Sequence, residues 1–299
     1  MRLPPLERIC RSYLLSILMQ VSTAISLLVV GVVGRIAFVR YHKFRFIVRI
    51  FLFLICIAIS SLAGILASPV LYLIGKGGYA NWLVGQIFYR TASVACNINC
   101  NVEGAEHLLS IRPCVFLANH QSLLDMFTLG AVFPVNTAIL AKAEIKWYPF
   151  MGQFMQLARN IFINRSDRSS AIETMAKVAD LLKSQNLGLW MYPEGTRSQA
   201  KTKMLLPFKK GAFHLATQGN IPLIPIVCST YYPCYSESEM VFEPATIQIR
   251  VLPPIETAGL TTADVDQLME TTRKAMLSTL EHLNTKPKDS ISMPKTKTE

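Results

Sequence analysis

The chain has 299 residues, of which 51% are hydrophobic and 16% charged, and its mean hydropathy is +0.34. This composition excludes disordered and collagen-like chains and is too apolar for an ordinary soluble enzyme, so we expect membrane segments beside a folded domain. The net charge of +11 fits either a nucleic-acid binder or a protein that meets anionic lipid, and the positions of the charges must decide between the two.

Two uncharged runs in the first third of the chain predict membrane helices. Residues 12–34 form a run of 23, which as a helix extends about 35 Å, enough for a hydrocarbon core of about 30 Å. Residues 50–75 form a second run of 26. The segment between them, 35–49, carries five Lys and Arg residues and no acid, and we expect a loop there. Residues 1–95 are therefore predicted to be a two-helix membrane-anchoring region.

The charges leave the membrane topology open. If both runs span the bilayer, the positive-inside rule places the basic loop in the cytosol and the rest of the chain on the opposite side. Three arginines before the first run favour the reverse orientation. A hairpin sunk into one leaflet is a third alternative, in which all of these charges share one headgroup layer.

From Cys96 onward, short apolar runs alternate with amphipathic stretches, which predicts an α/β domain over residues 96–284 with a largely parallel sheet. Strands are expected at 114–118, 136–141, 160–164, 188–192 and 222–227, and helices near 121–131, 144–157, 168–185, 207–218 and 264–283. The polar tail, 285–299, is predicted to be disordered.

A histidine and an aspartate follow the first of these strands. Active sites of α/β sheets gather where strands end, and His120 in the turn with Asp125 in the next helix would let the carboxylate hold one imidazole nitrogen. Such a pair is a general base near neutral pH. A hydrogen-bonded core histidine beside an N-capping aspartate fits the same residues.

Basic residues follow three other strands. Arg197 ends the segment Glu194-Gly195-Thr196-Arg197, whose glycine, hydroxyl and guanidinium suit a phosphate group, although a surface turn has the same composition. Arg165 and Lys142 follow two further strands. In a parallel sheet these cations would converge with His120 on one rim, as a phosphorylated, hydroxyl-bearing substrate requires.

Four ordered stretches resemble the motifs of the glycerolipid acyltransferases: N-H-x-x-x-x-D at 119–125, FINR at 162–165, EGTR at 194–197 and IPLIPIV at 221–227. The stretches AKAEIKWYPFMG, WMYPEGTRS and LLPFKKGAFHLA are similar to the subgroup that acylates 1-acylglycerol 3-phosphate. The resemblance implies a glycerolipid-acyltransferase-like sheet flanked by helices and preceded by the two-helix membrane segment.

The resemblance also implies a reaction, in which an acyl group passes from acyl-CoA to the sn-2 hydroxyl of lysophosphatidate, giving phosphatidate and CoA without a cofactor or metal. His120 would take the hydroxyl proton and Asp125 would orient the imidazole. The acceptor phosphate would be held by a set of polar and basic residues comprising Lys142, Arg165, Glu194, Gly195, Thr196 and Arg197, with Glu194 orienting neighbouring donors. The IPLIPIV strand would shape the acyl groove. Another lysophospholipid or glycerol 3-phosphate as acceptor, and a non-catalytic lipid-binding protein, are the alternatives.

The last five residues, Lys295 to Glu299, resemble the K-x-K-x-x signal of endoplasmic-reticulum membrane proteins, although a chance match in a lysine-rich tail is the alternative. We therefore expect the protein in the endoplasmic reticulum membrane or on lipid droplets. Residues 1–100 hold ten Lys and Arg against one acid, whereas 101–284 hold sixteen of each. The excess of positive charge thus flanks the apolar runs. This position favours anionic lipid as a partner and excludes nucleic acid.

Overall fold

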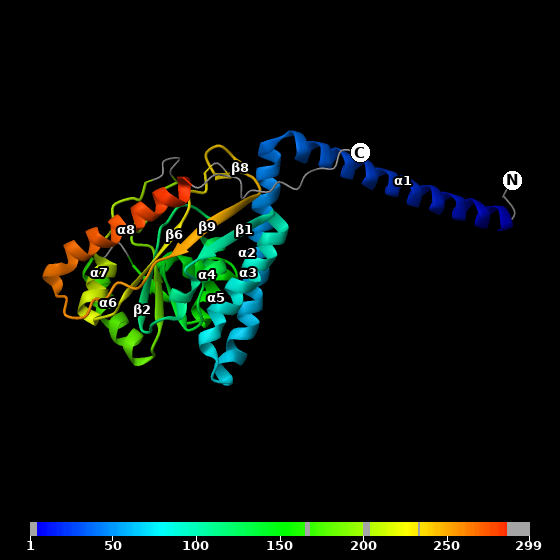
Figure 1. Cartoon of the computed structure of the whole chain (residues 1–299). Coiled ribbons are helices and arrows are strands. Elements are labelled where there is room, and N and C mark those ends of the chain that lie inside the picture. The colour runs from blue at the N-terminus through cyan, green and yellow to red at the C-terminus, as the bar shows by residue number, and fades with distance from the viewer. Residues whose placement is uncertain (1–4, 165–167, 200–203, 233, 286–299) are drawn as a thin grey trace.

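A seven-stranded sheet forms the centre of the computed structural model, which describes residues 5–164, 168–199, 204–232 and 234–285 (Figure 1). The strand order is β1-β9-β6-β2-β5-β3-β4, and all neighbours pair in parallel except β6 and β9. The strands are β1 (Ile98–Glu103), β2 (Cys114–Ala118), β3 (Thr137–Lys142), β4 (Ile161–Ile163), β5 (Gly188–Met191), β6 (Leu223–Cys228) and β9 (Ala245–Val251). The five predicted strands and the largely parallel sheet are confirmed, while β1 and β9 are additional to the prediction.

Helices cover both faces of the sheet, and the side chains of each strand alternate between them. Val115 and Leu117 of β2 face the layer of α6 (Arg168–Ser184), α7 (Gly211–Gly219) and α8 (Val265–Thr285). Phe116 and Ala118 face the layer that contains α2 (His42–Leu73), α3 (Ala80–Cys96) and α4 (Asp125–Val132). Burial on both faces explains why the central strands are continuous apolar runs.

The predicted helices 168–185, 207–218 and 264–283 correspond to α6, α7 and α8. The predicted helix near 144–157 is instead divided into a 3-10 helix, Ala143–Trp147, and α5 (Met151–Leu157). Pro149 lacks a backbone N–H, and Phe150 has a φ of 59°, so the chain cannot continue as one helix. A two-stranded hairpin, β7 (Tyr235–Ser236) and β8 (Val241–Phe242), lies outside the main sheet.

The basic segment between the two apolar runs is helical, so the predicted loop is wrong. Helix α1 (Pro5–Arg40) and α2 are separated only at Tyr41. Positive charge does not break a helix, and the junction supplies its own partners: the Arg45 guanidinium donates to the carbonyls of Phe38 and Val39 at 3.1 and 2.7 Å. These belong to the last turn of α1, where carbonyls lack helical partners.

Two of the arginines predicted to meet lipid headgroups are used inside the protein. Arg45 and Arg49 both form ion pairs with Glu243, directly after β8, at 2.7 and 2.9 Å. Arg49 is buried and also donates to the carbonyl of Phe242. This cluster, which we call the Glu243 clamp, fastens the start of α2 to the β7–β8 hairpin.

Two segments, Met19–Arg40 and His42–Leu73, are long and apolar enough to cross a membrane by length and composition. Helix α1 extends away from the domain, and α2 runs along its side, so the two diverge from Tyr41 and do not form the hairpin considered above (Figure 1). One face of α2 is buried against α3 and α5, whereas its outer face exposes large apolar side chains such as Phe51, Leu62 and Leu66. The predicted boundary near residue 95, between the membrane-anchoring region and the α/β domain, stays a prediction. Helices α2 and α3 both precede it, yet both contribute to the core of the domain.

Gly64 allows α5 to approach α2 closely. A Cβ at this position would lie 2.3 Å from the Phe154 ring and 2.5 Å from Val84. Gly64→Leu is expected to destabilise the fold by about 1–3 kcal/mol through overpacking, seen as a lower melting temperature in detergent. Gly34→Leu in α1, where nothing lies within 4 Å, is the matched control. Equal melting temperatures for the two variants would contradict this packing.

Candidate active site

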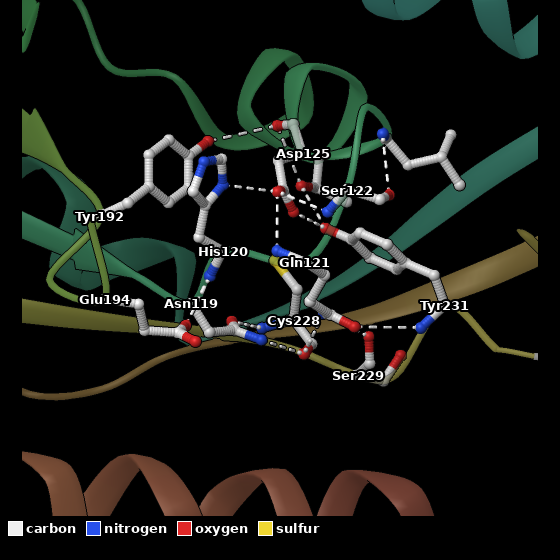
Figure 2. A network of polar contacts seen from close by, with 12 residues as sticks. Asn119, His120, Gln121, Ser122, Asp125, Tyr192, Glu194, Cys228, Ser229 and Tyr231 are labelled. Carbon is white, nitrogen blue, oxygen red and sulfur yellow. Dashed lines mark hydrogen bonds and ion pairs between the residues drawn. The ribbon is translucent and has the colours of Figure 1, made fainter. Parts of the chain in front are cut away.

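The candidate site lies where the carboxyl ends of β2, β5 and β6 meet (Figure 2). These strands are adjacent and parallel, so their C-terminal loops share one rim of the sheet. The loop after β2 carries Asn119 to Leu124, the loop after β5 carries Tyr192 to Gln199, and the segment after β6 carries Ser229 to Tyr231.

His120 and Asp125 form the predicted pair. His120 lies in the turn and Asp125 is the first residue of α4, and His120 Nδ1 is 2.7 Å from Asp125 Oδ2. The carboxylate accepts a hydrogen bond from Nδ1–H, which leaves Nε2 as the basic nitrogen. The imidazole is 20% exposed and the Asp125 side chain 4%. The predicted geometry of a held and partly open imidazole is therefore present.

Asp125 accepts further hydrogen bonds on both oxygens. Oδ2 also accepts from the backbone N–H groups of Gln121 and Ser122, at 2.8 and 2.9 Å. Oδ1 accepts from the hydroxyl of Tyr231 at 2.7 Å. The buried carboxylate thus accepts from two segments of chain, the loop after β2 and the segment after β6, and Figure 2 shows the Tyr231 ring approaching it from the side opposite His120.

Glu194 joins the two loops. It is buried, its Oε1 accepts from the backbone N–H of His120 at 2.7 Å, and its Oε2 accepts from that of Leu206 at 3.0 Å. Burial raises the pKa of Glu194 above its ordinary value, while these two hydrogen bonds act in the opposite direction. Glu194 therefore fixes the backbone at His120 and Leu206. Its expected role toward the donors that bind phosphate stays a prediction.

Backbone contacts hold the EGTR segment beside His120. Ser198 N–H donates to the His120 carbonyl at 2.9 Å, and Gln199 N–H donates to that of Gln121 at 3.0 Å. Thr196 and Arg197, directly before these two residues, are exposed. Gly195 has a φ of 69°, and a Cβ there would lie 2.8 Å from the Lys209 side chain, so the turn requires glycine.

Tyr192 covers the imidazole. Its ring stacks on His120 with centroids 4.2 Å apart. Burial raises the pKa of Tyr192 well above its ordinary value and the Asp125 carboxylate raises it further, whereas the Arg197 guanidinium lowers it.

Of the two other predicted phosphate ligands, only Lys142 lies within the described residues. Lys142 ends β3 on the same rim, where its Nζ lies 2.9 Å from Glu144 and its side chain is half exposed. Arg165 lies outside the described residues. Within the described ranges, no three His, Cys, Asp or Glu side chains cluster so as to hold a metal ion.

The end of β6 carries contacts that the sequence did not indicate. The Asn119 side chain donates to the Cys228 carbonyl at 3.0 Å and accepts from its N–H at 2.8 Å. Gln121 donates to the carbonyls of Cys228 and Ser229 and accepts from Tyr231 N–H. Burial raises the pKa of the Cys228 thiol to about 12, so this thiol is not a ready nucleophile.

A cavity of about 840 Å³ adjoins the EGTR segment. Tyr192, Pro193 and Gly195 form one side of it. Its other walls are mostly apolar, with two lysines at the start of α7; they include Leu140, Ile163, Met175, Met191, Phe208, Lys209 and Lys210. The cavity thus suits a ligand with an apolar chain and a negatively charged group.

Comparisons with known proteins identify the family of this chain. The model of a family described as Acyltransferase matches residues 99–229. The chain is 38% identical over 245 residues to the 1-acyl-sn-glycerol-3-phosphate acyltransferase of Saccharomyces cerevisiae, covering 82% of this chain and 80% of that one. It is 39% identical over 222 residues to the alpha enzyme of that name from Mus musculus, covering 74% and 77% of the two chains.

A solved structure shares the fold. The crystal structure of the 1-acyl-sn-glycerophosphate (LPA) acyltransferase PlsC from Thermotoga maritima matches with a TM-score of 0.56 at 21% sequence identity. The match covers 75% of this chain and 95% of that one. At this identity the similarity concerns the fold alone.

The two hydrogen bonds of Glu194 generate a prediction. Glu194→Gln replaces one acceptor oxygen with an NH₂ group that faces a backbone N–H, so we expect a loss of about 1–3 kcal/mol in stability and a lower melting temperature. Glu144→Gln, at a side chain that is 62% exposed, is the control and should change stability by less than about 0.5 kcal/mol. A Glu194→Gln variant as stable as the control would rule out the bridging role.

Proposed function

Because this chain belongs to the family of 1-acyl-sn-glycerol-3-phosphate acyltransferases, we propose that it transfers a fatty acyl group from acyl-CoA to the sn-2 hydroxyl of lysophosphatidate, forming phosphatidate and CoA. The observation that carries the proposal is the His120–Asp125 pair, open at Nε2 and held beside the cationic EGTR segment. Both substrates are consumed in the reaction, which uses no cofactor.

His120 acts as the general base. Nε2 takes the proton of the sn-2 hydroxyl as that oxygen attacks the thioester carbonyl, and Asp125 stabilises the imidazolium that forms. Collapse of the tetrahedral intermediate breaks the C–S bond, and the imidazolium returns the proton to the departing thiolate to give CoA. The acceptor hydroxyl is the nucleophile, so no acyl-enzyme is formed, consistent with the protonated, buried thiol of Cys228.

Arg197 is the principal ligand for the acceptor phosphate in this proposal. Its guanidinium suits phosphate oxygens, and its loop is tied to the His120 backbone, which keeps the phosphate site and the base in register. Lys142 adds positive charge at the end of β3, and the sequence assigns the same role to Arg165. Gly195 and Thr196 supply the turn, and Glu194 holds it in place.

The cavity beside the EGTR segment is the proposed donor site. Its apolar wall suits the fatty acyl chain, and Lys209 and Lys210 at its edge suit the phosphates of CoA. This assignment replaces the expected role of the IPLIPIV strand as a groove wall, because no residue of that strand lines the cavity.

The proposed location is the endoplasmic reticulum membrane, with lipid droplets as the alternative. The two apolar helices and the exposed face of α2 support membrane attachment, and burying that face in lipid removes apolar surface from water. The K-x-K-x-x ending supports the endoplasmic reticulum, and it lies outside the described residues, as does most of the tail predicted to be disordered.

The catalytic role of His120 is tested by His120→Ala. We expect kcat to fall by about 10²–10⁴-fold because the general base is lost, measured with labelled acyl-CoA and lysophosphatidate in membranes. His107→Ala, in the segment before β2, is the control and should retain activity. Equal activity of the His120 variant and the wild type would refute the proposed base.

The acceptor is tested with a panel of lysophosphatidate, lysophosphatidylcholine and glycerol 3-phosphate. Arg197→Ala should raise the KM for lysophosphatidate by roughly tenfold or more, since a charge-assisted contact is lost, and leave the KM for acyl-CoA nearly unchanged. If Arg197→Ala changed only the KM for acyl-CoA, Arg197 would not be a ligand for the acceptor phosphate. Preference of the wild type for lysophosphatidylcholine would contradict the acceptor assignment.

A further inference from the structure

Tyr231 has contacts that the proposed reaction has not yet used. Its side chain is only 2% exposed, and its hydroxyl lies 2.7 Å from Asp125 Oδ1 and 3.0 Å from Thr128 Oγ1. Thr128 is on the first turn of α4, and Tyr231 lies in the segment after β6, 106 residues from Asp125. The contact therefore joins two separate parts of the rim.

The hydroxyl can only donate to the carboxylate. Burial holds the pKa of Tyr231 well above its ordinary value, and the Asp125 charge raises it further, so the phenol stays protonated. Asp125 Oδ2 already accepts from His120 and two backbone N–H groups. Tyr231 is thus the donor that satisfies the other oxygen and fixes the rotation of the carboxylate plane.

The backbone around Tyr231 is held as firmly as its hydroxyl. Its N–H donates to Gln121 Oε1, and the Gln121 amide donates to the carbonyls of Cys228 and Ser229. Figure 2 shows that this network links the loop of His120 to the end of β6. Movement of Tyr231 relative to Asp125 would therefore require several hydrogen bonds to break together.

We propose that Tyr231 is a positioning residue for the acyl transfer, which acts through Asp125 to keep the His120 imidazole aligned with the acceptor hydroxyl. The inference rests on the proposed function and deepens it. It gives the segment that follows the IPLIPIV strand a part in catalysis, because β6 delivers Tyr231 to the carboxylate. Tyr231 itself does not touch the reacting atoms.

The first test is Tyr231→Phe, which keeps the buried ring and removes only the hydroxyl. We expect kcat to fall by about 10–100-fold from misalignment, with the KM for both substrates within about twofold of the wild type. Tyr235→Phe is the matched control: it removes a part-buried tyrosine hydroxyl, four residues along the chain, which lies 3.1 Å from Glu237. That variant should keep the kcat of the wild type.

A double-mutant cycle separates positioning from general stability. If Tyr231 acts through Asp125, then Tyr231→Phe should cause less than about a twofold further loss in an Asp125→Asn background. The inference would be overturned if the fold-losses in kcat of the two single variants multiplied in the double variant, or if Tyr231→Phe had the kcat of the wild type. If that variant fails to fold, Thr128→Val withdraws the second hydroxyl partner of Tyr231: a lower kcat at unchanged KM supports the inference, and an unchanged kcat overturns it.

The two proposals fail in different ways. A folded wild-type protein that acylates none of the acceptors contradicts the proposed function. A wild-type protein that acylates an acceptor, together with a fully active Tyr231→Phe variant, contradicts only the positioning role.

Discussion

A carboxylate buried away from water must find hydrogen-bond donors, and Asp125 obtains four from the described part of the chain. Two are backbone N–H groups, which shape the turn before α4, one is the imidazole of His120, and one is the hydroxyl of Tyr231. The loop after β2, the start of α4 and the end of β6 are thereby joined at one charge. Glu194 repeats the arrangement on the other side of His120, where its two oxygens bridge the loops after β2 and β5. The base is thus held between two buried carboxylates, each satisfied from more than one segment.

The central fold could be predicted because its strands are buried on both faces. Val115, Phe116 and Leu117 are all apolar for that reason, and the same logic located five strands and the rim of the sheet whose loops carry His120 and Arg197. Strand β1 was not predicted because it lies at the edge of the sheet and is not a continuous apolar run: polar residues such as Asn99 and Asn101 alternate with apolar ones along it. The loop predicted around Tyr41 is wrong because the prediction depends on positive charge, although charged residues are compatible with a helix.

Site residues could be predicted where the side chain is titratable or charged. They could not be predicted where their role depends only on contacts in the folded protein. His120, Asp125 and the EGTR segment stand out as titratable or cationic groups at strand ends, and the structure brings them together. Tyr231 carries no such mark, since its importance depends on a contact across 106 residues of sequence. Its one signal was its position shortly after a predicted strand. Sequence charge was also an incomplete guide to lipid contact, because Arg45 and Arg49 meet Glu243 within the protein.

The Glu243 clamp and Tyr231 lie on the same stretch of chain, twelve residues apart. At one end of that stretch, Glu243 forms ion pairs with Arg45 and Arg49 near the junction of α1 and α2. At the other end, Tyr231 donates a hydrogen bond to the Asp125 carboxylate behind His120. These contacts within the protein therefore fix the distance between the His120 imidazole and the apolar face of α2. A lysophospholipid anchored in a membrane exposes its glycerol hydroxyl at a set height as well. If α2 rests on the membrane, these internal contacts would favour an acceptor whose hydroxyl lies at the same distance from the membrane as the imidazole.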